Sequence, residues 1–252
     1  MDLATRLLAA ALLAVPARAQ TITPLVESGD SVPGVGSVTF IDNIAINATG
    51  DWLVEADTDH PDGTADSVLI RNGVLWLREG QALAAPAGAS IGSFDSVNLN
   101  ASAHSGWNFF LDGPPSGFDS GVYYDTSLLI QEGDVVLDPA LTPASPYLGF
   151  FDVKNNANDQ LALIATVDDA AIAASVDQVL VVLDTAGGVL IATDVRWKEG
   201  DVLPGQTEGI ATFATGPHQS GFNETGDVLF FADLSGDSSV DGVIYLNGTK
   251  LA

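Results

Sequence analysis

One short turn sequence recurs four times along the 252-residue chain, and this repeat constrains the fold more than any other feature. It reads ESGDSVPG, REGQALAAPAG, QEGDVVLDP and KEGDVLPG, with its glycine at Gly29, Gly80, Gly133 and Gly200. The glycines are separated by 51, 53 and 67 residues. A period of this length is typical of structural units that stack on one another.

Each turn is followed by the same succession of short segments. A Phe-containing apolar run comes first, then a turn that begins with asparagine, then an apolar run that ends at an aspartate. The asparagines are Asn47, Asn100, Asn156 and Asn223, and the aspartates are Asp57, Asp112, Asp168 and Asp233. A further apolar run follows, and the pairs Asn72-Gly73 and Asn247-Gly248 are strong signals for two-residue hairpins. Each unit therefore reads as four short strands joined by tight turns.

These patterns predict an all-β protein, and no segment after residue 19 combines a helical period with helix caps. The fold that we expect is a β-propeller-like array of about four four-stranded units. An irregular β-solenoid or β-sandwich is the alternative. A closed four-bladed ring and a part of a longer array both fit the pattern.

The first residues predict a signal peptide at positions 1–19. Arg6 precedes an apolar run from Leu7 to Val15, and Ala17-Arg18-Ala19 fits the small-residue cleavage pattern. The rest, 20–252, is expected to be a single β-repeat domain with units at about 26–77, 78–130, 131–197 and 198–252. We therefore expect the protein to be secreted or periplasmic, with cleavage after Ala19.

The composition limits the partners of the protein. The chain has 33 acidic and 8 basic residues, a formal net charge of −25, which disfavours nucleic acid as a ligand. No apolar run of the mature chain reaches the length of a membrane span, and without cysteine there is no disulfide. Polysaccharide or a protein of the cell envelope is the expected class of partner.

One acidic loop is a candidate calcium site. Asp57, Asp59, Asp62 and Asp66 could supply carboxylate oxygens, and Gly63 would allow the sharp turn that such a loop needs. The spacing departs from the EF-hand loop, so a solvated acidic turn is the alternative. No other cofactor is expected.

The sequence contains no evident catalytic set. His60, His104 and His218 fall in different units and lack metal-ligand spacing. This favours a non-enzymatic repeat protein with a binding or structural role at the cell envelope or outside the cell. The alternative is a secreted propeller hydrolase or lyase that acts on polysaccharide, with acidic groups from several units meeting in one cleft.

The asparagine turn resembles the repeat of a family of secreted bacterial proteins with the tandem motif N-x-x-G-x-x-x-x-F. Asn223, Gly226 and Phe231 match it fully, whereas the first unit has Asn47 and Gly50 but Glu55 in place of the phenylalanine. The second unit carries an insertion before Gly106, and the third has Asp159 where the motif has glycine. The resemblance implies a family of unknown function whose members often carry variable C-terminal anchors, and it implies no chemistry.

Overall fold

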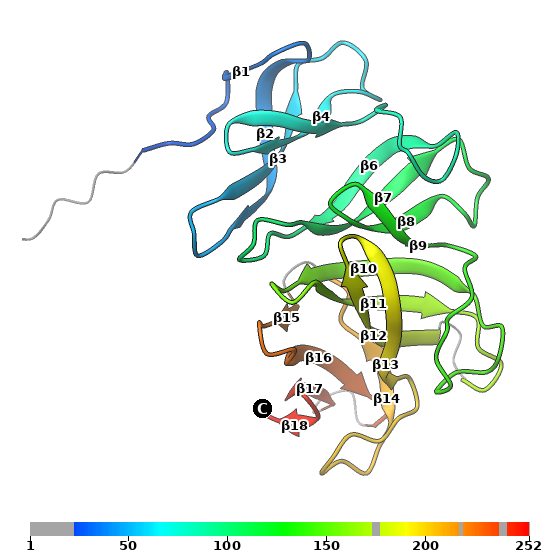
Figure 1. Cartoon of the computed structure of the whole chain (residues 1–252). Helices are drawn as coiled ribbons and strands as arrows, with labels where there is room; N and C mark the ends of the chain where they lie inside the picture. Colours follow the sequence, from blue (N-terminus) through cyan, green and yellow to red (C-terminus); the bar gives the residue numbers. More distant parts are fainter. Residues whose placement is uncertain (1–22, 173–176, 217–218, 237–240, 252) are drawn as a thin grey trace, which may run out of the picture.

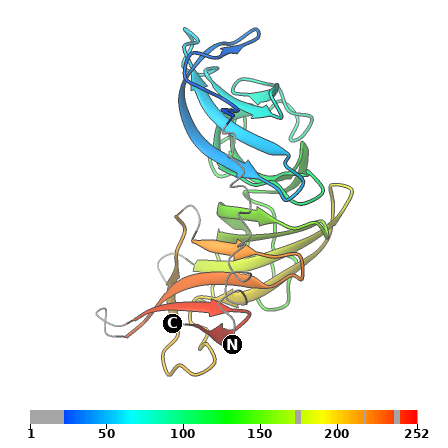
Figure 2. The ribbon, with the colours of Figure 1, turned by 90° about the vertical axis from the view of Figure 1, so that its left-hand side faces the viewer.

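The protein folds into four antiparallel sheets that follow one another in sequence order. The computed structural model describes residues 23–172, 177–216, 219–236 and 241–251, and within these ranges it contains strands and no helix. Figure 1 shows the sheets along an open arc, and Figure 2 shows the same order from the side. The predicted all-β, propeller-like array is confirmed.

The sheets are built from neighbouring strands, apart from a small departure in the last sheet. The first comprises β1 (Ser31–Val32), β2 (Gly36–Ile46), β3 (Trp52–Thr58), β4 (Ser67–Arg71) and β5 (Val74–Arg78). The second comprises β6 (Ser90–Val97), β7 (Gly106–Asp112), β8 (Ser120–Tyr124) and β9 (Ser127–Gln131). The third comprises β10 (Tyr147–Asn155), β11 (Gln160–Val167), β12 (Asp177–Ala186) and β13 (Val189–Lys198). The fourth comprises β14 (Ile210–Phe213), β15 (Ser220–Phe222), β16 (Val228–Leu234), β17 (Gly242–Leu246) and β18 (Thr249–Lys250), with β14 and β15 both paired to β16.

The array does not close into a four-bladed ring. The first and last sheets lie at opposite ends of the arc, with two sheets between them (Figure 1). The described residues therefore do not form the closed ring that the sequence allowed.

The hydrophobic core is divided into layers between successive sheets. Each interior layer takes alternate residues from the facing strands, as the period of two in a β-strand requires. In the layer between the first two sheets, Trp107 is fully buried and stacks on Trp76 with ring centroids 4.7 Å apart. Because every interior sheet uses both faces for packing, a single unit could not bury its apolar surface alone.

The repeated glycine turn ties the end of one sheet to the first strand of the next. The backbone N–H of Gly80 donates to the carbonyl of Ile91 at 2.8 Å, and that of Gly133 donates to Tyr147 at 2.9 Å. Gly200 makes the same bond to Ile210 at 2.8 Å. All three glycines have φ between +71° and +86°, a conformation that costs glycine little because it has no Cβ.

The four repeated asparagines form a ladder across the sheets. The side-chain Nδ2 of Asn47 donates to the carbonyl of Asn100 at 3.0 Å. Asn100 donates in the same way to Asn156 at 2.7 Å, and Asn156 donates to Asn223 at 3.1 Å. This asparagine ladder explains why the motif residue recurs, because each copy joins its own sheet to the following one.

Within its own turn, each ladder asparagine also fixes the backbone. Its Oδ1 accepts from the N–H groups two and four residues later; for Asn100 these belong to Ser102 and His104, both at 2.9 Å. The residue three positions after the asparagine has positive φ in all four units and is Gly50, Ala103, Asp159 and Gly226. Ala103 and Asp159 therefore occupy the glycine position of the motif. The insertion that we expected before Gly106 is absent, because Trp52 and Ser105 each lie five residues after their ladder asparagine and donate from N–H to equivalent hairpin residues, Asn72 and Asp125.

The predicted two-residue hairpins are present and are joined to the asparagine turns. Asn72 and Gly73 both have positive φ, and the Oδ1 of Asn72 accepts from the N–H of Trp52 at 2.8 Å. We expect Asn72→Ala to lower the free energy of unfolding by about 1–2 kcal/mol, since alanine disfavours this conformation and lacks the acceptor. Urea denaturation followed by tryptophan fluorescence measures the loss. An unchanged midpoint would contradict this role of the side chain.

Candidate ligand-binding cleft

A polar cleft of about 400 Å³ lies between the first two sheets. Its wall carries six carboxyl groups, together with amide, hydroxyl and aromatic side chains. The acidic residues are Asp42, Glu55, Asp57, Asp66, Glu79 and Asp95. The volume falls within the usual range of small-molecule sites.

One residue of the cleft wall stands at a motif position. Glu55 stands where the motif has phenylalanine, and its side chain points toward the second sheet. The residue at the same place in the third unit is Ile164, which is buried in the layer between the third and fourth sheets. In the second unit it is Asn108, which is 0% exposed and donates to Asp95 and to the carbonyl of Phe150, so Glu55 is the one carboxyl group at this place in the four units. The departure from the motif was visible in the sequence, but its meaning depended on which face of β3 carries the residue.

Glu55 lies deep in this cleft and is only 6% exposed. Its Oε2 accepts a hydrogen bond from the side-chain amide of Asn43 at 2.6 Å. Burial, together with the negative charges of Asp42, Asp57 and Asp95, raises the pKa of Glu55 to about 7. The group can therefore hold or release a proton near neutral pH.

Two further acids of the wall form a close pair at the end of the cleft. The Oε2 of Glu79 accepts from the N–H of Ser67 at 3.2 Å, and the carboxyl group also bonds to Asp66. Burial first, and then the neighbouring Asp66, raises the pKa of Glu79. Burial also raises the pKa of Asp57, with the charges of Asp42 and Asp66 adding to it.

The glutamate of the repeated turn is buried in the next two units as well. Glu132 accepts from the N–H of Asp119 at 3.1 Å and contacts its carboxyl group, and Glu199 lies beside Asp177. Burial, followed by these acidic neighbours, raises the pKa of Glu132 and of Glu199 to about 7. These pairs recur with the fold, so they belong to the architecture, whereas Glu55 is particular to the cleft.

The four residues of the predicted calcium loop take different positions. Asp57 and Asp66 line the cleft. Asp59 accepts from the N–H of Ser37 at 2.6 Å, and Asp62 accepts from the N–H and hydroxyl of Thr64 at 3.1 and 2.8 Å. Among the described residues, no three carboxylate or imidazole groups are arranged as ligands of one metal ion.

The calcium prediction can be tested directly. A calcium ion held by these side chains would raise the melting temperature with ligand concentration, because it binds only the folded chain. Melting the protein in 1 mM calcium and in excess chelator makes the comparison, and Asp59→Asn with Asp62→Asn removes the two carboxylates outside the cleft. Equal midpoints in the two solutions would exclude the site.

His60 and His104 do not line the cleft. The ring of His60 bonds within its own loop to the backbone of Asp62 at 3.2 Å. His104 contacts the Oδ2 of Asp125 at 2.6 Å, in the turn of the second sheet. His218 lies outside the described residues.

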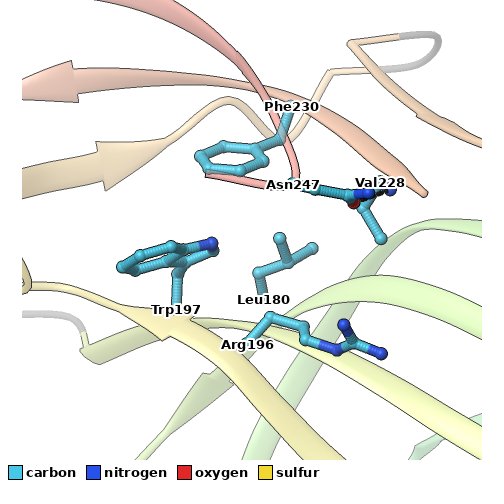
Figure 3. Close-up of a pocket in the computed structure, with 6 residues that line it drawn as sticks. All are labelled: Leu180, Arg196, Trp197, Val228, Phe230 and Asn247. Atoms are coloured by element: carbon cyan, nitrogen blue, oxygen red, sulfur yellow. Dashed lines mark hydrogen bonds between the residues drawn. The ribbon is translucent and has the colours of Figure 1, made fainter. Parts of the chain in front are cut away.

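A second, smaller pocket lies between the third and fourth sheets (Figure 3). Trp197 and Arg196 of β13 line one side, and Val228 and Phe230 of β16 line the other. Its volume of about 150 Å³ is below the usual range of small-molecule sites. We regard it as a packing gap between two sheets.

Repeated antiparallel sheets, joined by glycine turns and an asparagine ladder, place the chain in the class of all-β repeat proteins. It belongs to a family of unknown function (DUF7453), whose model matches residues 15–250. Comparison with curated proteins found no match. Comparison with solved structures found none either. Within the described ranges, no helix has the length and hydrophobicity of a membrane span.

Proposed function

We propose that this protein is an exported, non-enzymatic repeat protein that binds a polysaccharide of the cell envelope or of the surroundings through the cleft between its first two sheets. The observation that carries the proposal is Glu55, a carboxyl group that is only 6% exposed at a position where the second unit has Asn108 and the third has Ile164. Asn43 donates one hydrogen bond to the Oε2 of Glu55, and a ligand in the cleft would supply donors to the remaining acceptor sites of the carboxyl group. The presence of this group there fits a role in binding.

The chemistry of the cleft supports this class of ligand. Carboxylate and amide oxygens accept hydrogen bonds from sugar hydroxyl groups, and Asn43, Ser67 and Ser93 add polar groups to the wall. The aromatic ring of Phe94 also lines the cleft and offers an apolar surface to a sugar ring. The asparagines and glycines of the repeat join neighbouring sheets. The ligand would therefore contact residues that differ from one unit to the next.

Binding can be tested with matched variants. The mature chain, residues 20–252, is applied to a polysaccharide array, and a ligand found there is titrated by calorimetry. We expect Glu55→Gln with Asp57→Asn to weaken binding at least tenfold. The control, Asp112→Asn with Asp168→Asn, changes the exposed aspartates that end the corresponding strands of the second and third sheets, and should leave affinity unchanged. Equal affinity of the two variants would remove the cleft as the site.

Export rests on residues 1–19, which lie outside the described residues. Expression of the full chain in a Gram-negative host, followed by fractionation, tests it. We expect a periplasmic or secreted product that begins at Gln20 by mass spectrometry. A cytoplasmic product that retains residue 1 would contradict the signal peptide.

One observation favours a second candidate, a polysaccharide hydrolase or lyase. Acidic side chains from two units meet in one cleft, and Glu55 has a pKa of about 7, suited to a general acid. Incubation of the mature chain with polysaccharides, with reducing ends and unsaturated sugars as readouts, separates the candidates. Product formation that Glu55→Gln abolishes would favour the enzyme, and binding without turnover would favour the first proposal.

A further inference from the structure

The outer face of the first sheet, on the side away from the second sheet, is apolar and partly uncovered. Ile41, Ile44 and Ile46 of β2 are 37%, 70% and 69% exposed. Together with Trp52 and Leu25 they line an apolar pocket of about 310 Å³. An exposed apolar surface of this kind usually marks an interaction site.

The same positions are buried wherever a preceding sheet is present. The residue before the ladder asparagine is Ile46 in the first unit and Leu99 in the second, where it is only 6% exposed. Three residues before the asparagine, Ile44 is 70% exposed, whereas Val153 of the third unit is 0% exposed. The face of the first sheet therefore resembles an interior sheet that lacks its neighbour.

The segment after the glycine turn of the first unit packs as it does in the interior sheets. Val32 follows the glycine turn and packs on the outer face, as Val136 and Leu203 do at the interfaces before the third and fourth sheets. Terminal units of stacked repeats usually replace the apolar outer surface with a polar one. No such replacement is seen in the described part of the first unit.

The opposite end of the array presents the complementary face. Leu229, Ile244 and Leu246 of the last sheet are 37%, 37% and 36% exposed. Their counterparts in the third sheet are Ala162, Leu180 and Val182, which are 3%, 1% and 2% exposed because the fourth sheet covers them. The last sheet thus resembles an interior sheet that lacks the sheet after it.

The asparagine ladder ends with matching groups. Asn156 donates from Nδ2 both to Gln160 within its turn and to Asn223 of the next sheet. In the described chain Asn223 makes only the first kind of bond, to Asp227 at 2.8 Å. At the other end, the carbonyl of Asn47 accepts only from Gly50 among the described residues. One end therefore offers a donor and the other an acceptor.

We propose that two copies of this chain associate head to tail, with the last sheet of one copy packed on the first sheet of the other. The contact has the same arrangement as the interfaces between sheets within one chain, and the two exposed end faces form its apolar layer. The Nδ2 of Asn223 then donates to the carbonyl of Asn47 in the second copy. Such an interface joins two different surfaces, so it produces either a closed ring or a growing stack.

The size of the mature chain in solution tests the association. Sedimentation velocity from 1 to 500 µM is run at 150 mM salt, because the net charge of −25 on each copy opposes contact when it is unscreened. We expect the mass to rise with concentration from that of one chain to multiples of that mass. Ile44→Glu and Leu229→Glu should each raise the dissociation constant at least tenfold. Val189→Glu, at a position of the third sheet that is 66% exposed, should not.

Cysteine cross-linking tests the geometry of the contact. The sequence contains no native cysteine that could form competing disulfides. Between the third and fourth sheets, the Nδ2 of Asn158 donates to the carbonyl of Glu224 at 2.5 Å. Asn158 lies two residues after the ladder asparagine of the third sheet, and Glu224 lies one residue after that of the fourth. The equivalent positions across the proposed contact are Thr225 and Ala48. Mixing Thr225→Cys with Ala48→Cys under mild oxidation should give a disulfide-linked dimer, and either variant alone should give none.

Two results would overturn the proposal. The first is a single-chain mass across the whole concentration range. The second is association in which a single cysteine variant cross-links with itself, or in which the mixed pair does not cross-link, because the copies would then meet through other faces. The glutamate variants change side chains that are already exposed, so circular dichroism should show them folded and the comparison stays valid.

Discussion

Asn100→Ala is expected to lower the free energy of unfolding by about 3–4 kcal/mol. The Oδ1 of Asn100 accepts from the backbone of Ser102 and His104, and its Nδ2 donates to Asn156 in the next sheet. The side chain is only 3% exposed, so alanine would leave backbone groups without partners and without water. Each buried group left in this way costs about 1–3 kcal/mol. Urea denaturation followed by circular dichroism measures the loss.

Asn223→Ala is the matched control for this prediction. Asn223 makes the same bonds within its turn, to the N–H groups of Thr225 and Asp227 at 3.0 and 2.8 Å, but it lies on the exposed end of the ladder. We expect a loss of about 1 kcal/mol, because water replaces the missing acceptor. Equal losses for the two variants would show that the ladder adds nothing to the turn.

Asn100→Asp separates the two roles of the side chain. Aspartate keeps the oxygen that accepts in the turn, but it loses the amide donor and sets a negative charge against the carbonyl of Asn156. A loss close to that of alanine would assign most of the energy to the bond between sheets. A loss below about 1 kcal/mol would assign most of the stabilising energy of Asn100 to its hydrogen bonds within the turn.

Raising the pH from 5 to 8 is expected to lower the free energy of unfolding by about 3 kcal/mol. Glu55, Glu132 and Glu199 have pKa values raised from 4.5 to about 7 by burial and, after burial, by nearby acids. Between these two pKa values the folded chain binds more protons than the unfolded chain, so stability falls as pH rises. Solvent screening limits the effect to about 1 kcal/mol per group.

The trend reverses in acid. Hydrogen bonds from Thr49, Asn47 and Asn72 hold the pKa of Asp51 below its usual value of 3.8. The stability from this group is present above pH 4 and is lost as pH falls through the lower pKa. Maximum stability is therefore expected near pH 5, and thermal melts at half-unit intervals from pH 3 to 9 would locate it. A midpoint that rises steadily from pH 5 to 8 would contradict the assignment.

Glu132→Gln identifies one of the groups responsible. Glutamine imitates the protonated carboxyl group, since its oxygen accepts from the N–H of Asp119 and its amide can donate to the carboxylate of Asp119. We expect this variant to melt higher than the native protein at pH 8 and to show a smaller slope with pH. Glu27→Gln, in the same turn of the first unit, changes an exposed side chain and should leave the slope unaltered.

The candidate cleft was only partly foreseeable. The sequence showed that Glu55 breaks the motif and that the loop from Asp57 to Asp66 is acidic. It could not show that Glu55, Asp95 and Glu79 line one space, because they come from strands whose proximity depends on how two sheets pack. The two aspartates that local spacing grouped with Asp57 and Asp66 bond instead to nearby backbone and hydroxyl groups.

By itself the sequence determined the secondary structure and the number of sheets. Turn residues such as Asn72-Gly73 and the glycines of the repeat act through local backbone preferences, and the alternation of apolar residues is a property of each strand. The tertiary structure alone decided that the asparagines join neighbouring sheets, that Glu55 lines a cleft and that both end faces stay apolar. The ladder and the cleft depend on contacts between residues far apart in the sequence, such as Asn47 with Asn100, and Glu55 with Asp95 in the cleft wall, which no local preference encodes.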